Sequence, residues 1–166
     1  MSTLSAGLSG VAGEYFVAAE LSRRGYVASI TLRNTRGIDI LVSNRDATRS
    51  VGVQVKCTQG NFNSWLVKKL DSGELASNLF FVFVSMNGLG EPAYYVVPKE
   101  VVAESVEAAH SKYLADGEIR GLERKDTAMR KFADREGKYR DRWDLLGLDG
   151  PPPKHKLKRP GRTRTD

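Results

Sequence analysis

The stretch Val51–Cys57 has an apolar side chain at every second position, and this alternation constrains the fold more than any other feature of the sequence. Side chains of an extended strand point alternately to its two faces. The three valines and the cysteine therefore share one face of a predicted strand, whereas Gln54 and Lys56 share the other. Two polar side chains on one face of an otherwise apolar strand form a candidate functional site.

The stretch Ile38–Val42 repeats this pattern with one acidic residue, Asp39, on the face opposite its isoleucine and valine neighbours. The seven residues 44–50 connect the two stretches, which predicts antiparallel neighbouring strands. Asp39 is then expected beside Gln54 and Lys56. A carboxylate within an aliphatic strand is costly to bury alone, and either a divalent metal ion or Lys56 would compensate its charge.

Five short segments rich in β-branched and aromatic residues are predicted to be strands, and Asn87-Gly88 predicts a turn between the last two. A helix before them and helices after them predict a central sheet with helices packed against it. The five segments are Tyr26–Leu32, Ile38–Ser43, Val51–Thr58, Leu79–Met86 and Ala93–Val97.

Helices are predicted on both sides of the strand region. Apolar residues recur at three- and four-residue spacing over residues 8–24, until two arginines and a glycine end the pattern. The charged stretch Ala115–Trp143 is expected to form exposed helix around Met129 and Phe132. Another helix is expected from Pro98, with one apolar face made of Val102, Val106, Ala109 and Tyr113.

The composition indicates one domain, because the chain has 166 residues and 40% of them are hydrophobic. We expect the domain to span residues 1–150, since three prolines then begin a basic tail, 151–166, that is expected to be disordered. A single cysteine excludes an internal disulfide and a Cys-rich zinc site. No apolar run could span a bilayer and no secretory signal is visible, so we expect a cytoplasmic protein without a membrane partner.

The net charge of +6 is concentrated in this tail, which contributes +5 and leaves +1 for residues 1–150. Basic tails add salt-sensitive affinity for phosphates, or they only solubilise a chain. The tail residues predicted to contact nucleic acid are Lys156, Lys158 and Arg159.

Three motifs together resemble the PD-(D/E)XK nuclease superfamily, which includes restriction endonucleases and archaeal Holliday-junction resolvases. The motifs are Glu14 in the first helix, Gly37-Ile38-Asp39, and Gln54-Val55-Lys56. The resemblance covers roughly residues 8–100. It implies an α/β, restriction endonuclease-like fold, with a central mixed sheet of about five strands flanked by helices.

The resemblance also implies a role for each motif residue. Asp39 would bind Mg²⁺ or Mn²⁺, Gln54 would supply an oxygen where the family usually has Glu or Asp, and Glu14 would complete the metal site. Lys56 would position or activate the attacking water. Phosphodiester hydrolysis needs an activated water and charge compensation at the phosphate, which a hard divalent ion supplies. The amide of Gln54 is a weaker ligand than a carboxylate, so metal binding would depend on Asp39 and Glu14.

Simpler alternatives exist for these four residues. Asp39 and Lys56 would form a cross-strand ion pair, which stabilises little at a sheet edge. Glu14 would be a solvated helix carboxylate, and Gln54 an amide hydrogen-bonded within the sheet.

Other residues have paired interpretations as well. Lys68 and Lys69 would bind phosphates or remain solvated. Trp65 would stack on an unpaired base or pack in the core.

The resemblance implies a Mg²⁺-dependent DNA endonuclease, with RNA as the alternative substrate. A homodimer would suit the cutting of two strands. The first alternative is a catalytically inactive nucleic-acid-binding module of the same fold. The second is a protein-interaction domain that binds a partner through Ala115–Trp143.

Overall fold

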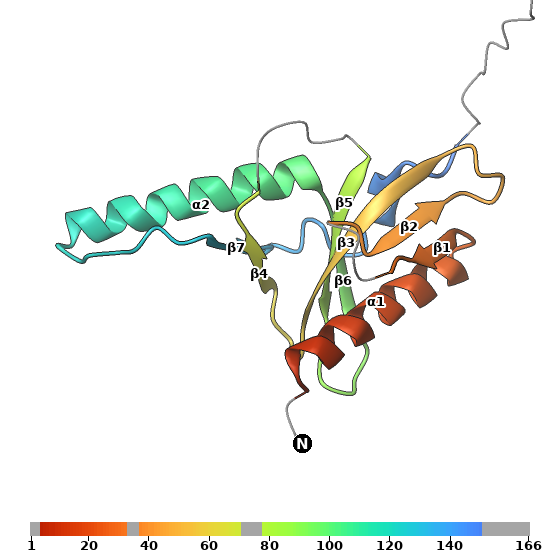
Figure 1. The fold of residues 1–166 in the computed structure, drawn as a ribbon, viewed down its shortest axis with the longest axis horizontal. Coiled ribbons are helices and arrows are strands. Elements are labelled where there is room, and N and C mark those ends of the chain that lie inside the picture. Colours follow the sequence, from red (N-terminus) through yellow and green to blue (C-terminus); the bar gives the residue numbers. More distant parts are fainter. Residues whose placement is uncertain (1–3, 33–36, 71–77, 151–166) are drawn as a thin grey trace, which may run out of the picture.

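A computed structural model describes residues 4–32, 37–70 and 78–150 (Figure 1). The helices are α1 (Ala6–Arg23), α2 (Lys99–Ile119) and the short 3-10 helix η1 (Trp143–Leu146). The strands are β1 (Val27–Ile30), β2 (Ile40–Ser43), β3 (Ser50–Thr58), β4 (Ser64–Lys68), β5 (Leu79–Ser85), β6 (Ala93–Pro98) and β7 (Met129–Ala133). The first helix, the five predicted strands and the helix after Pro98 are confirmed.

Five strands form one mixed sheet in the order β1-β2-β3-β5-β6. β3 and β5 are parallel, with Val55 opposite Val82, and the other neighbouring pairs are antiparallel. A parallel pair needs a long crossover connection, and the connection between β3 and β5 contains β4. The expected central mixed sheet flanked by helices is therefore confirmed.

Helix α1 covers one face of this sheet. Val17 and Leu21 of α1 are fully buried in a core that includes the alternating valines of β3. The helix approaches β3 closely at Gly13, where an added Cβ atom would lie 2.8 Å from the Cβ of Cys57. The apolar face predicted for Val51–Cys57 is thus the face that packs against α1.

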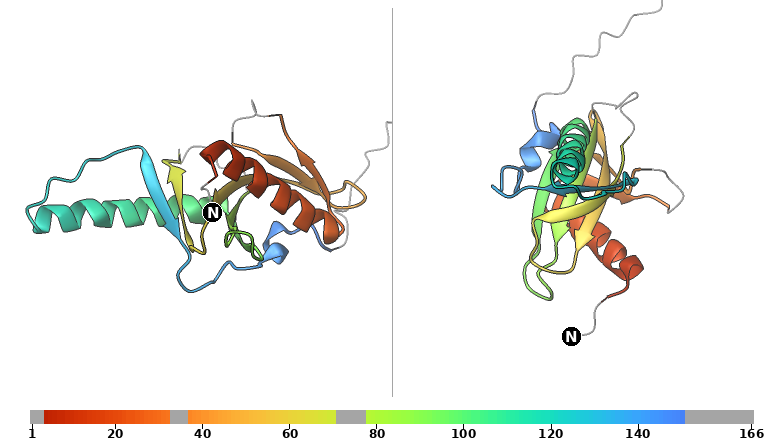
Figure 2. Two further views of the ribbon diagram at one scale, coloured as in Figure 1. Left: turned by 90° about the horizontal axis from the view of Figure 1, so that it is seen from below. Right: turned by 90° about the vertical axis from the view of Figure 1, so that its left-hand side faces the viewer.

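Helix α2 and a separate two-stranded sheet of β4 and β7 cover the opposite face, as the two views of Figure 2 show. Trp65 and Phe132 are opposite partners in the β4–β7 pair. Phe83 of the large sheet stacks on Phe132 with 4.6 Å between ring centroids. This second core therefore joins the two sheets.

Helix α2 extends beyond the edge of the large sheet (Figure 1). Its predicted apolar face is only half buried, because Val102 and Val106 lie in the second core whereas Ala109 and Tyr113 are exposed. The C-terminal half of α2 thus projects beyond the sheet, and the sheet does not bury its apolar residues.

The prediction of helix around Met129 and Phe132 is wrong, because these residues form β7. Arg130 and Phe132 are buried and alternate with exposed neighbours, which is the two-residue period of a strand. β7 pairs with β4, a strand that the sequence analysis did not predict. Charges of both signs around β7 masked its alternation.

The predicted turn at Asn87-Gly88 is confirmed, because both residues have positive φ angles, 53° and 65°, between antiparallel β5 and β6. Such backbone angles favour Asn and Gly.

Within the described residues, no helix has the length and apolar character to cross a membrane. The tail 151–166 lies outside the described residues, together with Lys156, Lys158 and Arg159. The domain boundary expected at residue 150 therefore stays a prediction.

Candidate active site

Asp39 is fixed to the middle of β3 by both its main chain and its side chain. Its amide donates a 2.8 Å hydrogen bond to the carbonyl of Val53, and its Oδ2 accepts a 2.7 Å hydrogen bond from the amide of Val55. Ile40 is the register partner of Val53, so continuing the register by one residue places Asp39 opposite Gln54. The predicted neighbourhood of Asp39 and Gln54 follows from this pairing.

The main chain around Asp39 is also hydrogen-bonded to Thr31, the residue that follows β1. The hydroxyl of Thr31 donates to the carbonyl of Ile38 at 2.7 Å, and the amide of Thr31 donates to the carbonyl of Asp39 at 2.9 Å. Hydrogen bonds to two different regions therefore restrain Asp39. Its carboxylate accepts from β3, and its main chain pairs with Thr31. A restrained ligand loses less conformational entropy when an ion binds.

Glu14 and Asp39 line the same cleft, whose volume is about 280 Å³. The close approach of α1 at Gly13 brings the helix to this position. Added Cβ atoms on Gly7 and Gly10, which also line the cleft, would have no neighbour within 4 Å, so the glycines leave its helix side open. Two carboxylates from distant parts of the sequence thus face one accessible space.

Gln54 and Lys56 line a neighbouring pocket of about 540 Å³ together with Lys68 and Phe81. Gly37 lines this pocket whereas Asp39 lines the cleft, and the two cavities have no described lining residue in common. The prediction that Gln54 joins Asp39 and Glu14 around one metal ion stays a prediction. Lys56 and Lys68 together give the pocket two positive charges that suit a phosphate.

The cleft fits a hard divalent cation. Mg²⁺ is usually bound through one or two carboxylates, with waters and substrate phosphate oxygens as the remaining ligands. In residues 4–32, 37–70 and 78–150, no group of three or more His, Cys, Asp and Glu side chains is arranged so that it could hold a metal ion. Glu14 and Asp39 are therefore the two carboxylates that line the described cleft, and their number and type match what Mg²⁺ usually takes from a protein.

An ion pair between Asp39 and Lys56 was the simplest alternative, but among the described residues no such pair forms. The carboxylate of Asp39 is instead engaged with the β3 main chain, and Lys56 lines the other pocket. Asp39 and Lys56 therefore line different cavities and do not neutralise each other directly.

The assignment of Trp65 to nucleic-acid binding needs correction. Its side chain is 2% exposed, and its indole N–H donates to the carbonyl of Val84 at 3.0 Å. The rings lie 4.9 Å from those of Phe83 and of Tyr95, centroid to centroid. The packing alternative holds, because a ring enclosed in this way cannot stack on a base.

Lys68 and Lys69 differ in position although they are adjacent. Lys68 is exposed and lines the pocket of Gln54 and Lys56, whereas exposed Lys69 lines neither that pocket nor the cleft. The amide of Lys69 donates to the carbonyl of Ala128 at 2.7 Å, which joins the ends of β4 and β7. Lys68 is thus the stronger phosphate-binding candidate.

Two contributions to the cleft were not predicted from the sequence. Thr31 lies at its wall, and the glycines of α1 form its helix side. The available signal was the recurrence of glycine at every third residue, Gly7, Gly10 and Gly13, immediately before Glu14. Glycine is unfavourable inside a helix, so this recurrence indicates a close approach or an open surface.

The fold is that of the restriction endonuclease-like class. Residues 6–116 match the family model Mrr_cat, described as restriction endonuclease, and the chain belongs to this family. The solved structure of a bacterial homing endonuclease, I-Ssp6803I, is similar, with a TM-score of 0.53 and 15% sequence identity over 88% of this chain and 93% of that chain. This likeness concerns the fold alone. Comparison with curated proteins gave no match.

Proposed function

We propose that this protein is a Mg²⁺- or Mn²⁺-dependent endonuclease that hydrolyses phosphodiester bonds in DNA. The observation that carries the proposal is the placement of Asp39, which shares a cleft with Glu14 and is bonded to β3 beside Gln54 and Lys56. Family membership supports the reaction class. The structure of similar fold is that of a homing endonuclease, which supports an endonuclease activity on a nucleic acid for this chain.

Asp39 and Glu14 would hold the metal ion at the cleft. The bound ion would supply positive charge that makes a water nucleophilic near neutral pH and offsets charge on the phosphoryl oxygens. Oδ2 of Asp39 is engaged by the Val55 amide, so this hydrogen bond orients Oδ1 for a ligand. The backbone bonds of Asp39 keep this orientation when substrate enters.

Lys56 would act at the phosphate from the adjacent pocket. Its ammonium can bind a nonbridging phosphate oxygen and orient the attacking water, while Lys68 holds a neighbouring phosphate. The water oxygen then bonds to phosphorus while it loses a proton to solvent, the bond from phosphorus to the leaving sugar oxygen breaks, and that oxygen takes up a proton from solvent. Gln54 would offer its amide oxygen to the ion or its amide N–H to the phosphate.

Cleavage of linear, nicked and branched DNA, and of RNA, tests this function directly. We expect the wild type to cleave DNA with Mg²⁺ or Mn²⁺ and to be inactive with EDTA. Asp39→Asn keeps an oxygen for the Val55 amide but removes the charge, so its activity should fall by at least about a hundredfold. Unchanged cleavage by Asp39→Asn, or cleavage in EDTA, would refute the proposed site. A homodimer is part of the proposal, and sedimentation of the protein with and without duplex measures it.

A non-catalytic nucleic-acid-binding module is the second candidate, and the neutral side chain of Gln54 favours it. Without a third carboxylate among the described residues, metal affinity rests on Glu14 and Asp39. Calorimetric titration with Mn²⁺ discriminates the two functions: a site that Asp39→Ala abolishes supports the nuclease. Gln54→Glu restores the carboxylate usual in the superfamily and should tighten Mn²⁺ binding only if Gln54 contributes to the same site.

A further inference from the structure

A second, larger groove lies away from the candidate active site. Its volume is about 990 Å³, and it is lined by the C-terminal half of α2, the segment that returns from α2 to β7, and the β4–β7 pair. Figure 2 shows α2 and the returning segment as an arm that projects from the two sheets. The groove is thus a feature of the arm and not of the large sheet.

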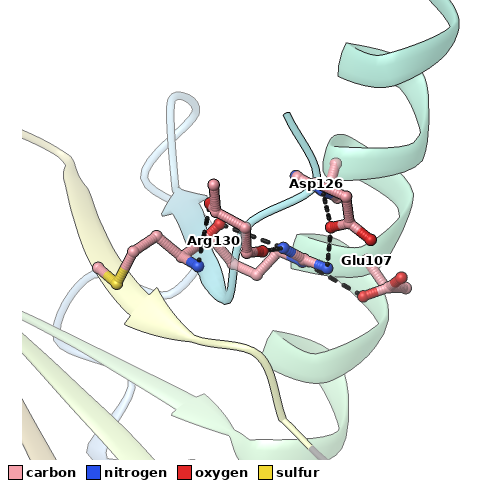
Figure 3. A network of polar contacts seen from close by, with 6 residues as sticks. Glu107, Asp126 and Arg130 are labelled. Atoms are coloured by element: carbon pink, nitrogen blue, oxygen red, sulfur yellow. Dashed lines mark hydrogen bonds and ion pairs between the residues drawn. The ribbon is translucent and has the colours of Figure 1, made fainter. Parts of the chain in front are cut away.

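The arm is held in place by a polar network around Arg130, which Figure 3 shows between α2 and the returning segment. The Nε of Arg130 lies 3.4 Å from Glu107 Oε2, and its Nη2 lies 3.3 Å from Asp126 Oδ1. His110 Nε2 lies 2.8 Å from the same Asp126 oxygen. The Arg130 side chain is only 1% exposed. Its contacts hold α2, the returning segment and β7 together at the wall of the groove.

A second contact fixes the far end of the arm. The guanidinium of Arg124 lies 4.2 Å from the ring centroid of Tyr113 and donates to the Tyr113 carbonyl. Gly117 allows this approach, because an added Cβ atom there would lie 2.7 Å from Arg124 Cδ. The groove is therefore formed before any partner binds, which lowers the conformational cost of binding.

Positive charge gathers along this groove. Lys125, Lys131 and Arg135 line it, are exposed, and take part in no ion pair among the described residues. Glu123 is the one acidic residue among its described lining. Residues 1–150 carry 20 basic and 19 acidic side chains, so a cluster of this kind is not a consequence of the overall composition. A groove with exposed cations and few anions suits a polyanion.

The groove and the pocket of Lys56 both border β4. Leu66 lines the groove and Lys68 lines the pocket of Lys56, and both are on the exposed face of β4. Two residues on one strand face are separated by roughly 7 Å. Successive phosphates of one DNA strand advance by roughly 3.4 Å along the helix axis. A strand bound at Lys56 would therefore reach the groove within a few nucleotides.

We propose that this groove binds the sugar–phosphate backbone of the DNA on one side of the cleaved bond, with Lys125, Lys131 and Arg135 as the phosphate contacts. The inference rests on the proposed function, because that function places a phosphate beside Lys56. Phosphate contacts of this kind carry no sequence information and fix the register of the substrate on the protein.

The experiment measures binding of a short fluorescein-labelled linear duplex to the full chain in EDTA, over salt concentrations from about 50 to 200 mM. The test variant is Lys125→Ala/Lys131→Ala/Arg135→Ala. The control variant, Arg45→Ala/Lys138→Ala/Arg140→Ala, removes three exposed positive charges outside the groove. Equal thermal unfolding midpoints establish that both variants are folded.

The slope of log affinity against log salt should fall by about two to three in the groove variant, because each lost phosphate contact removes about 0.9. The control variant should keep the wild-type slope. Equal slopes in all three proteins, or equal losses in both variants, would overturn the inference. Cleavage assays separate this outcome from the proposed function. If the wild type cleaves DNA but the groove variant binds DNA as the wild type does, only the role of the groove is refuted. If the groove variant binds DNA more weakly but the wild type cleaves nothing, only the nuclease function is refuted.

Discussion

The carboxylate of Asp39 accepts a 2.7 Å hydrogen bond from the amide of Val55, so a candidate metal ligand also completes the pairing of β2 with β3. In a regular ladder a main-chain carbonyl would take this amide hydrogen. Here the side chain of Asp39 takes it, immediately before the first paired residue of β2, Ile40. The structural and the proposed catalytic roles of Asp39 therefore depend on different oxygens of one side chain.

Substitutions at Asp39 should separate these two roles. Asp39→Ala leaves the Val55 amide without its acceptor, which costs about 1–3 kcal/mol of unfolding free energy. Asp39→Asn retains an acceptor oxygen and should be less destabilised than Asp39→Ala. Urea unfolding measures both free energies, and equal stability of the two variants would contradict the structural role.

Gly13 should be the least replaceable glycine of α1. A Cβ atom there would lie 2.8 Å from Cys57 Cβ, so Gly13→Ala is expected to destabilise by about 1–3 kcal/mol through overpacking. Gly10→Ala is the matched control, because its Cβ would meet nothing within 4 Å. The control should gain up to about 1 kcal/mol from helix propensity. Thermal unfolding that ranks Gly13→Ala at or above Gly10→Ala would contradict the close packing of α1 on β3.

Tyr26 should cause the free energy of unfolding to fall at alkaline pH. Burial, together with the hydrogen bond from its hydroxyl to Asp149 at 2.7 Å, raises the pKa of Tyr26 to about 12. Because the folded-state pKa exceeds the unfolded value near 10, this contribution is complete below about pH 10 and is lost as the pH rises through about 12.

Urea unfolding at several pH values measures this effect. Tyr26→Phe should weaken the fall in unfolding free energy over that range. Part of the fall should remain in the variant, because burial also raises the pKa of Tyr94 to about 12. A pH profile identical to that of the wild type would contradict the account of Tyr26.

The core of the fold could be predicted from the sequence wherever one face of an element is apolar and the partner strand is close in the chain. Val51–Cys57 and Ile38–Val42 satisfy both conditions, and β3 and β2 formed with the expected faces. β4 and β7 fail the second condition, because Trp65 pairs with Phe132 across a long stretch of chain. Register over such separations is set by tertiary packing, which local patterns do not report.

The sequence could nominate residues for the candidate site, but it could not show which cavity each residue lines. Alternation placed Asp39, Gln54 and Lys56 on related faces, because side-chain direction follows from strand geometry. It could not show that Asp39 lines a cleft with Glu14 while Gln54 and Lys56 line a different pocket. The position of Asp39 depends on hydrogen bonds of Val55 with its side chain and of Thr31 with its main chain, which no sequence pattern encodes.

If Lys56 acts on the phosphate, the single-turnover rate of DNA cleavage with Mn²⁺ depends on its ammonium group. Loss of one group that stabilises developing charge slows such reactions by about 10²–10³-fold, so Lys56→Ala should be slower by that amount at saturating DNA. Lys69→Ala, an exposed lysine that lines neither pocket, should keep the wild-type rate. A wild-type rate in Lys56→Ala, or equal losses in both variants, would contradict the account.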